Sequence, residues 1–264
     1  MPSVQRLLIV GSGDVARRAA TWLAQRFRVF ALVRPGKASA DAWRGLGACP
    51  ITGDLDQPQS LLRLAGLAER VLHLAPPQAE GVRDERTRHL LAALSQGGSL
   101  PRRLVYVSTT GVYGDCGGAL IDETQPCRPH SARAFRRLDA ENCLRRWGGA
   151  HRVSVLLLRA PGIYAAKDRN GMGERLPRAR LEAGLPVPLP GEDVHSGHIH
   201  ADDLARACCR ALFWGGAGRS FNVVDESDLS MGDYFDAVAD YLRVPCPPRR
   251  ARAILQQQLS MTQL

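Results

Sequence analysis

The sequence predicts an α/β fold, a doubly wound parallel β-sheet with a small C-terminal lobe on the substrate side. Short apolar runs rich in Val, Ile and Leu alternate with longer stretches of helical periodicity, as in parallel sheets whose strands are joined by helices. The first apolar run also leads into a glycine turn, Gly11-Ser12-Gly13, which is followed directly by a helical pattern.

Six apolar runs are predicted to be strands, and each is continuous rather than alternating, which is typical of strands covered on both faces. The predicted strands are Arg6–Val10, Val29–Val33, Cys49–Thr52, Val71–Leu74, Leu104–Val107 and Val153–Leu158. The predicted helices between them are Val15–Gln25, Gln59–Glu69, Arg83–Gln96 and Ala132–Trp147. The last helix carries an apolar stripe, which we expect to be buried while its arginines face solvent. The stripe comprises Phe135, Leu138, Cys143 and Leu144.

The pattern becomes less regular after Arg159. Residues Ala165–Pro190 are rich in Gly, Pro and Arg and are predicted to form a mobile substrate-side segment. A helix over Asp202–Phe213 and a strand over Phe221–Val224 follow. Further on, Ser230 has the position of an N-cap, with Asp233 in the first turn of a helix that reaches Leu242. The tail from Arg249 to Leu264 gives only a weak helical signal.

The composition narrows the class of protein. The net charge is +9, but only Lys37 and Lys167 of the 35 basic residues are lysines, and the arginines are scattered. No nucleic-acid-binding signature accompanies them, so we expect no nucleic-acid partner. No run approaches the roughly 18 apolar residues of a membrane span, and no signal peptide is apparent, so we expect a cytoplasmic protein with no membrane association. The seven cysteines lack CxxC spacing and are predicted to be free, mostly buried thiols.

The glycine turn has the GxGxxA spacing of a dinucleotide-binding site. Its residues are Gly11, Ser12, Gly13, Asp14, Val15 and Ala16. The first glycine permits a tight turn, the second leaves room for a pyrophosphate, and the small alanine lets the helix pack closely on the strand. The helix N-terminus that follows favours the negative charge of the pyrophosphate. We therefore assign residues 1–164 to a Rossmann core, and residues 165–264 to a mixed segment that returns to the core over 202–224 and forms the lobe.

The end of the second predicted strand indicates which nicotinamide cofactor is bound. An Asp or Glu there would hold the ribose 2′-hydroxyl of NAD, about 20 residues past the glycines. Here the chain has Arg34 instead, followed by Pro35, Gly36 and Lys37. A guanidinium can pair with a 2′-phosphate through charge-assisted hydrogen bonds. We therefore predict NADP as the cofactor, with NAD as the alternative.

Several later motifs resemble a known superfamily in the right order. Val105-Tyr106-Val107-Ser108-Thr109-Thr110-Gly111-Val112-Tyr113-Gly114 is similar to an active-site strand, and Arg159-Ala160-Pro161-Gly162-Ile163-Tyr164 to an RxxxIYG motif. His198-Ile199-His200-Ala201-Asp202-Asp203 is similar to an H-V-D-D segment. On these motifs the chain resembles the extended and atypical short-chain dehydrogenase/reductase superfamily, the NAD-dependent epimerase/dehydratase-like group. The resemblance implies further cofactor-lining residues: Asp54, Leu55, Leu74, Ala75, Pro76, Pro161 and Gly162. It also implies Thr109 as the catalytic Ser/Thr, and a homodimer as a hypothesis.

The chain departs from this superfamily at its catalytic pair. Relatives carry Tyr-x-x-x-Lys, but neither Tyr nor Lys occurs from Gly114 to Ile163. In relatives a Glu commonly follows this Lys by four residues. If Glu141 is that Glu, Arg137 stands at the Lys position and Arg133 at the Tyr position. Arginine can hold ribose hydroxyls, so Arg137 is a candidate binding residue, but the pKa of arginine is too high for proton transfer near neutral pH. Tyr113 is a candidate substitute proton donor.

A metal site is the weaker interpretation of the three histidines His195, His198 and His200. The neighbouring Asp202 and Asp203 are explained as the start of a helix, whose dipole favours carboxylates, so we predict no metal.

Three functions stay open. The leading hypothesis is an NADP-preferring oxidoreductase that transfers hydride to or from a small carbonyl, alcohol or sugar-like substrate. The second is a catalytically silent NADP(H)-binding redox sensor or interaction protein, which the missing Tyr and Lys favour. The third is a nucleotide-sugar epimerase or dehydratase, which is weaker because those reactions depend on the missing base.

Overall fold

The computed structural model describes residues 4–167 and 173–255. The chain divides into two compact units, one comprising Met1–Ala160 with Ala201–Val223 and the other Pro161–His200 with Val224–Leu264. Residues 168–172 of the segment predicted to be mobile, and residues 256–264 of the weakly helical tail, lie outside the described residues.

The first unit is built on a parallel sheet in which seven strands are described, in the order β10-β6-β5-β4-β1-β2-β3. The strands are β1 (Arg6–Val10), β2 (Arg28–Val33), β3 (Cys49–Thr52), β4 (Arg70–His73), β5 (Arg103–Thr109), β6 (Ser154–Ala160) and β10 (Ser220–Asn222). The order reverses at β1, where Leu7 pairs with Val29 of β2 on one side and with Arg70 of β4 on the other. This reversal defines a doubly wound sheet, so the predicted fold class is confirmed.

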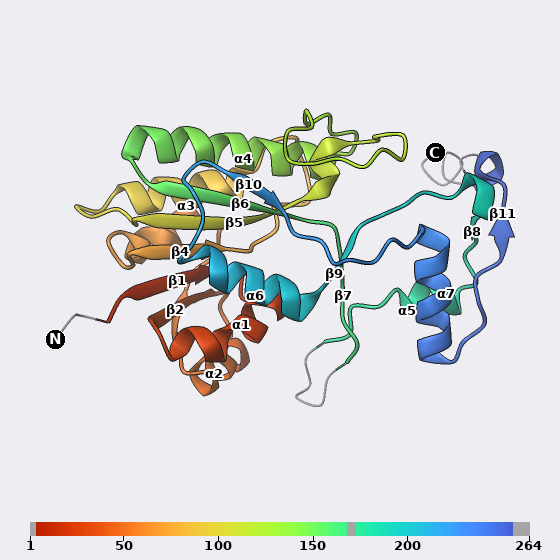
Figure 1. Ribbon diagram of the computed structural model, residues 1–264. Helices are drawn as coiled ribbons and strands as arrows, with labels where there is room; N and C mark the ends of the chain where they lie inside the picture. The colour runs from red at the N-terminus through yellow and green to blue at the C-terminus, as the bar shows by residue number, and fades with distance from the viewer. Residues whose placement is uncertain (1–3, 168–172, 256–264) are drawn as a thin grey trace. The chain divides into compact units, whose positions relative to one another are not determined.

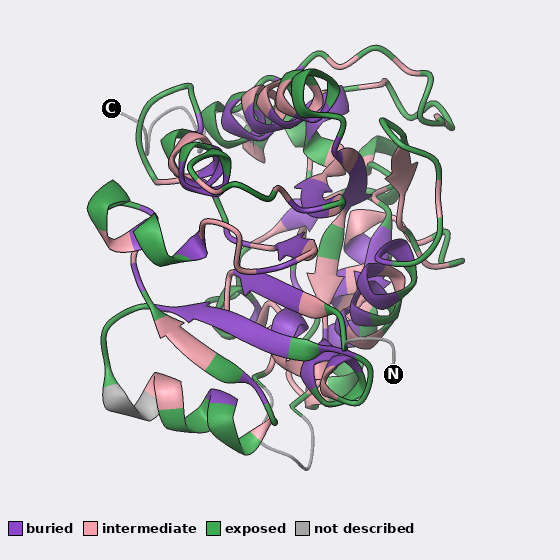
Figure 2. Ribbon diagram, turned by 90° about the vertical axis from the view of Figure 1, so that its left-hand side faces the viewer, coloured by how far each residue is buried: buried purple, intermediate pink, exposed green. Residues whose placement is uncertain are grey.

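Helices cover both faces of this sheet. They are α1 (Asp14–Ala24), α2 (Lys37–Gly45), η1 (Pro58–Leu64), α3 (Glu85–Ser95), η2 (Thr110–Tyr113), α4 (Ala132–His151) and α6 (Ala201–Ala211). Figure 1 shows α3 and α4 on one face and α1 and α6 on the other. The central strands are buried along most of their length (Figure 2), because helices exclude water from both sides.

One hydrophobic core cluster joins the sheet to α3 and α4. It includes Leu8 and Val71 from the strands, Leu90 from α3 and Leu144 from α4, all fully buried. Burying a side chain of this size contributes about 1.5–3 kcal/mol, so this layer is a main source of the stability of the first unit.

Several elements differ from the sequence-based expectation. Residues Pro58–Leu64 form a 3-10 helix where an α-helix was expected, and α2 was not predicted at all. Strand β3 is less buried than the other strands because it lies at the edge of the sheet, with only β2 as a neighbour. The described end of the chain contains the short strand β11 (Arg249–Arg250), and residues 252–255 of the weakly helical tail are helical.

The predicted burial of α4 is wrong in part. Phe135 is 47% exposed, whereas Arg136 and Arg137 are buried. Both arginines donate to backbone carbonyls: Arg136 to that of Gly81 at 2.6 Å, and Arg137 to that of Val107 at 2.9 Å. Hydrogen bonding therefore overrides the apolar pattern on this helix.

The second unit has its own small core. Its elements are β7 (Gly162–Tyr164), α5 (Arg178–Glu182), β8 (Val187–Pro188), η3 (Pro190–Glu192), β9 (His198–His200), α7 (Met231–Leu242) and β11. Leu181, Val187 and Phe235 pack together in this core, and β7 pairs with β9. The predicted N-cap is confirmed, because Ser230 Oγ accepts a hydrogen bond from the N–H of Asp233 at 3.2 Å.

All seven cysteines are free, as predicted, but only Cys208 and Cys209 are buried, so the expectation of mostly buried thiols is wrong. Within the described part of the chain, no helix has the length and apolar character needed to cross a membrane.

A buried polar chain links the end of β4 to the start of α3. Thr87 Oγ1 lies 2.9 Å from Nε2 of His73 and donates to Oδ2 of Asp84 at 2.8 Å. Asp84 also caps α3 by accepting from the N–H of Thr87. Complete burial, reinforced by the charge of Arg137, lowers the pKa of His73 to about 3, so its imidazole is neutral in the folded protein.

We predict that His73 makes the protein acid-sensitive. An unfolded histidine binds a proton below pH about 6.5, but folded His73 binds one only near pH 3, so unfolding gains protons as the pH falls. The free energy of unfolding should therefore fall by up to about 1.4 kcal/mol per pH unit below pH 6.5 because of this one group. Denaturant titrations of the wild type and of His73→Leu should differ by that slope. The exposed control His151→Gln should keep the wild-type slope, and an unchanged slope in His73→Leu would contradict the assignment.

Candidate functional site

The glycine turn lies against the segment that follows β4. Gly11 has φ +98°, and a Cβ built on it would lie 2.3 Å from the backbone nitrogen of Ala75. The carbonyl of Val10 accepts from the N–H groups of both Leu74 and Ala75, at 2.7 and 3.1 Å. Only glycine fits this contact, which fixes the turn beside two residues after β4 that the resemblance implies as cofactor-lining.

Helix α1 begins directly after this turn, at an N-cap that leaves room for a ligand. Gly13 is the N-cap and provides no side-chain hydrogen bond, and a Cβ on Gly13 would meet nothing within 4 Å. Val15 and Ala16 are buried and pack the helix on the sheet, while Ser12 is half-buried. A helix start of this kind, with open space before it, can bind an anion such as a pyrophosphate.

An ion-pair cluster compensates the acidic residue at this helix start. Arg18 donates to Asp14 at 3.0 Å and to Asp202 of α6 at 2.7 Å, and its own side chain is buried. The guanidinium offsets the carboxylate that would otherwise repel an anion at the N-terminus of α1. It also ties α1 to the start of α6.

The ends of β2 and β3 place the predicted adenosine-side residues next to each other. Val33 pairs with Thr52, and the N–H of Gly53 donates to the carbonyl of Val33 at 3.0 Å. Arg34 follows Val33 and is exposed, with no ion pair or hydrogen bond to any described residue. Asp54 and Leu55 follow Gly53 at the same edge, so the structure brings these three predicted cofactor residues together. The side chain of Lys37 is outside what the structure describes.

Thr109 ends β5 and caps the short helix η2. Its Oγ1 accepts from the N–H of Gly111 at 3.2 Å, and its hydroxyl proton has no acceptor among the described residues. Thr109 is half-buried. Its hydroxyl is therefore available to donate to an oxygen atom of a ligand.

Tyr113 belongs to a buried network behind Thr109. Its hydroxyl accepts from Arg159 at 2.9 Å and donates to Oδ1 of Asn222 at 2.7 Å. Arg159 also forms two hydrogen bonds with the carboxylate of Glu141, at 2.7 and 3.1 Å, in a pair that is almost completely buried. Burial opposes the charge of Arg159, but Glu141 outweighs it and raises the pKa of this guanidinium. The tyrosine hydroxyl is thus fully engaged in the protein interior.

The two residues at the Tyr and Lys positions lie in different environments. Arg133 is exposed, whereas Arg137 is buried and donates through Nη1 to the hydroxyl of Tyr106 at 2.8 Å and to the carbonyl of Val107. Burial raises the pKa of Tyr106 to about 12, so its hydroxyl stays protonated. The structure does not place a phenol at the position where relatives carry one.

Pro161 and Gly162 belong to the second unit, where Gly162 starts β7. Gly162 leaves room for the ring of His198, which would lie 3.2 Å from a Cβ at this position. The three histidines do not converge, because His195 pairs with Asp228 at 2.9 Å, whereas His198 stacks on Tyr234 with ring centroids 4.0 Å apart. Among the described residues, no group of three or more His, Cys, Asp or Glu could hold a metal ion.

Sequence reasoning missed several residues that organise this site. Arg18 has a recognisable signal, because it follows Asp14 by one helical turn. Arg86, which pairs with Asp56, has none, because 30 positions separate them and only the fold brings them together. Asn222 lies in the predicted strand Phe221–Val224, but its contact with Tyr113 is also tertiary.

We predict opposite effects of alanine at two glycines. Gly11→Ala would force a Cβ onto the backbone of Ala75 at a positive φ, and should lower the free energy of unfolding by at least about 2 kcal/mol. In the matched control, Gly149→Ala lies within α4, where a Cβ meets nothing, and should stabilise by about 0.5–1 kcal/mol. Chemical denaturation measures both changes. A Gly11→Ala protein as stable as the wild type would refute the close contact.

Comparisons with known proteins agree with this architecture. The chain is 27% identical over 267 residues to GDP-6-deoxy-D-mannose reductase of Pseudomonas aeruginosa, covering 91% of this chain and 81% of that protein. Among solved structures, dTDP-glucose 4,6-dehydratase of Streptomyces venezuelae with NAD bound matches with a TM-score of 0.72 at 21% identity, over 93% of this chain and 84% of that one. UDP-glucose 4-epimerase of Thermus thermophilus in complex with NAD matches with a TM-score of 0.70 at 24% identity, over 93% of this chain and 85% of that one. Both structures share the fold.

The family comparison covers most of the chain. The model of the NAD dependent epimerase/dehydratase family matches residues 9–224, from the first strand through the last strand of the sheet. This range includes the glycine turn, Arg34, Thr109 and the buried pair of Glu141 and Arg159. The chain therefore belongs to the NAD-dependent epimerase/dehydratase family.

Proposed function

We propose that this protein is an NADP-preferring oxidoreductase that transfers hydride to or from a small carbonyl, alcohol or sugar-like substrate without the usual Tyr-Lys pair. The observation that carries the proposal is the combination of the Gly11 turn with an unpaired Arg34 at the adjacent strand end within the described chain. The turn supports a dinucleotide, and the free guanidinium supports a 2′-phosphate on its ribose.

The substrate class is suggested by the curated relative. That protein is named GDP-6-deoxy-D-mannose reductase, and it matches this chain over most of both lengths. A keto group on a sugar or similar polyol would suit such chemistry. We therefore favour a sugar-like carbonyl as the substrate over a simple aldehyde.

The chain's own residues hold and polarise the substrate. The bound nicotinamide supplies or accepts the hydride. Thr109 donates a hydrogen bond to the substrate oxygen, because its proton has no acceptor within the described chain. In the reducing direction the substrate oxygen would take its proton from solvent, because Arg133, at the usual Tyr position, cannot give one near neutral pH. The lack of a general acid costs typically about 10²–10⁴-fold in rate, so slow turnover is expected.

Arg137 supports the site by holding β5 through hydrogen bonds, and it does not carry a proton. Its Nη1 fixes the carbonyl of Val107, two residues before Thr109, and the hydroxyl of Tyr106. We propose that this anchoring holds the end of β5 at the nicotinamide side. A direct contact between Arg137 and the ribose stays a prediction.

A catalytically silent NADP(H) sensor is the second candidate. The observation that favours it is the engagement of Tyr113 between Arg159 and Asn222, which leaves this phenol occupied in the interior. Nucleotide binding without turnover on any keto-sugar or simple carbonyl would support the sensor. Measurable turnover would exclude it.

We predict that Arg34 determines the choice between cofactors. Replacing Arg34 with Asp should weaken NADPH binding at least about 10-fold more than NADH binding, because each charge-assisted bond to the phosphate is worth roughly 1.5–3 kcal/mol. Titration with each nucleotide, followed by quenching of tryptophan fluorescence, measures both affinities. The exposed Arg63→Asp makes the same change of net charge and should leave the ratio unaltered. Equal weakening of both nucleotides by Arg34→Asp would refute the assignment.

We predict that Tyr113 stabilises the protein more than it serves catalysis. Tyr113→Phe removes hydrogen bonds to Arg159 and Asn222 and should lower the free energy of unfolding by about 1.5–3 kcal/mol, while NADPH affinity stays within about twofold. The exposed Tyr241→Phe is the control. If Tyr113→Phe kept full stability but lost about 100-fold in kcat on a substrate found by carbonyl screening, Tyr113 would instead be the substitute proton donor.

A further inference from the structure

Three charged residues lie where β2, β3 and α3 reach the edge of the sheet that carries the Gly11 turn, which we call the cofactor edge. Arg34 follows β2, Asp56 follows β3, and Arg86 lies in the first turn of α3. The pairing of Val33 with Thr52 makes the first two segments leave the sheet side by side. The carboxylate of Asp56 is therefore an acidic neighbour of the guanidinium that we assign to the 2′-phosphate.

Arg86 occupies both oxygens of that carboxylate. Its Nε donates to Oδ1 of Asp56 at 2.7 Å and its Nη2 donates to Oδ2 at 2.6 Å, in a two-pronged contact. The hydrogen bonds from Arg86 are the main cause that lowers the pKa of Asp56, and the charges of Arg34 and His89 act in the same direction. The Asp56 carboxylate is thus bound by Arg86 and is also close enough to Arg34 to be affected by its charge.

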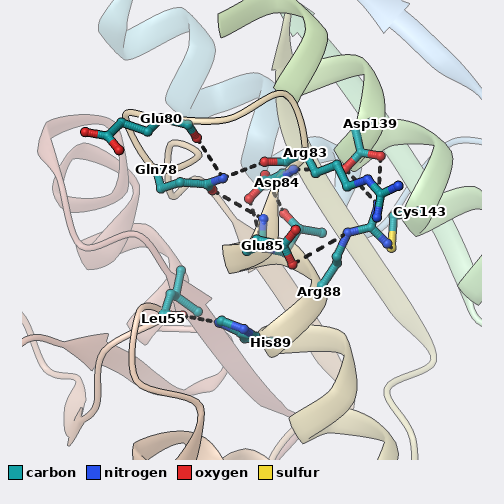
Figure 3. Close-up of polar contacts among 11 residues, drawn as sticks. Leu55, Gln78, Glu80, Arg83, Asp84, Glu85, Arg88, His89, Asp139 and Cys143 are labelled. Carbon is teal, nitrogen blue, oxygen red and sulfur yellow. Dashed lines mark hydrogen bonds and ion pairs between the residues drawn. The ribbon is translucent and has the colours of Figure 1, made fainter. Parts of the chain in front are cut away.

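Helix α3 fixes Arg86 in this orientation. Nη1 of Arg86 lies 3.2 Å from the carbonyl of Pro76, in the segment after β4. One turn further, Nδ1 of His89 bonds the carbonyl of Leu55 at 2.7 Å, next to Asp56 (Figure 3). Residues three apart share a helix face, so Arg86 and His89 together hold the segment that carries Asp56.

The consequence for Arg34 is that it has no partner among the described residues. A carboxylate with two free oxygens beside it would compete for its guanidinium and would also repel a phosphate. Because Arg86 binds both carboxylate oxygens of Asp56, Asp56 competes less for Arg34 and repels a phosphate less.

We propose that Arg86 is a specificity-determining positioning residue, which keeps Asp56 from pairing with Arg34 and so leaves Arg34 available for the 2′-phosphate of NADP(H). This inference rests on the proposed function, because it assumes that Arg34 binds the phosphate. Arg86 itself touches no cofactor in this scheme and acts through Asp56.

A double-mutant cycle separates this role from a merely structural one. In Arg86→Met, the freed Asp56 competes for Arg34, so NADPH binding should weaken roughly fivefold to 10-fold while NADH binding stays within about twofold. In Asp56→Asn, the competing charge is absent and NADPH binding should equal or exceed that of the wild type. The double variant should recover NADPH affinity to within about threefold of the wild type, because nothing is left for Arg86 to hold.

The matched control is Arg88→Met. Arg88 lies on the same helix but pairs with Asp139 of α4, at 2.8 and 2.9 Å (Figure 3). Breaking that ion pair changes the net charge and the helix in the same way, so it should leave the NADPH-to-NADH affinity ratio unchanged.

Isothermal titration with NADPH and NADH measures the affinities of the wild type and of all these variants. If Arg86→Met weakens both nucleotides equally and the double variant is no better, Arg86 only supports the fold and the inference is overturned. If Arg34→Asp lowers the affinity ratio but Arg86→Met behaves like Arg88→Met, the inference fails while the proposed cofactor site stands. If the unaltered protein binds neither nucleotide, the proposed function and this inference both fail.

Discussion

The cofactor edge of the first unit depends on the close approach of Gly11 to the backbone of Ala75. The carbonyl of Val10, directly before the glycine turn, accepts from the N–H groups of Leu74 and Ala75, so the turn that leads into α1 lies against the segment after β4. The turn lies at β1, where the strand order reverses and where open sheets of this type bind their ligands. Backbone packing against Ala75 therefore requires glycine at position 11. The shape of the turn that we assign to the nucleotide depends on this packing.

Ion pairs organise the rest of this edge, and they do so in two different ways. Arg18 offsets the charges of Asp14 and Asp202 at two helix starts, and Arg86 does the same for Asp56. In the interior, between α4 and β6, Glu141 and Arg159 form an almost completely buried pair. Pairs of the first kind adjust the local charge that an anionic ligand meets. The buried pair stays together because leaving either charge alone in the interior would be strongly unfavourable. Arg159, held in this way, donates to the hydroxyl of Tyr113 and so fixes its orientation.

The sequence predicts well those features that depend on local pattern. The strands of the core, the glycine turn and the Ser230 cap follow from apolar runs, turn chemistry and capping preference, and the structure has them. It predicts poorly where tertiary hydrogen bonds compete with hydrophobicity. Arg137 is charged and yet buried, because a phenol and a carbonyl accept hydrogen bonds from its guanidinium, and no pattern within α4 reveals them. The same limit applies to the pairing of Asp56 with Arg86.

The place of Arg137 has an evolutionary consequence. Alignment on Glu141 gives Arg137 the position of the lysine that relatives carry, and here this side chain is buried and donates to the hydroxyl of Tyr106. Both the Tyr106 hydroxyl and the Val107 carbonyl accept from Nη1 of Arg137, so a residue that replaces it must satisfy two buried acceptors. Acquiring the usual pair would thus require compensating changes in the interior as well as a new tyrosine. We therefore expect that a change toward the usual pair one residue at a time would pass through a less stable protein.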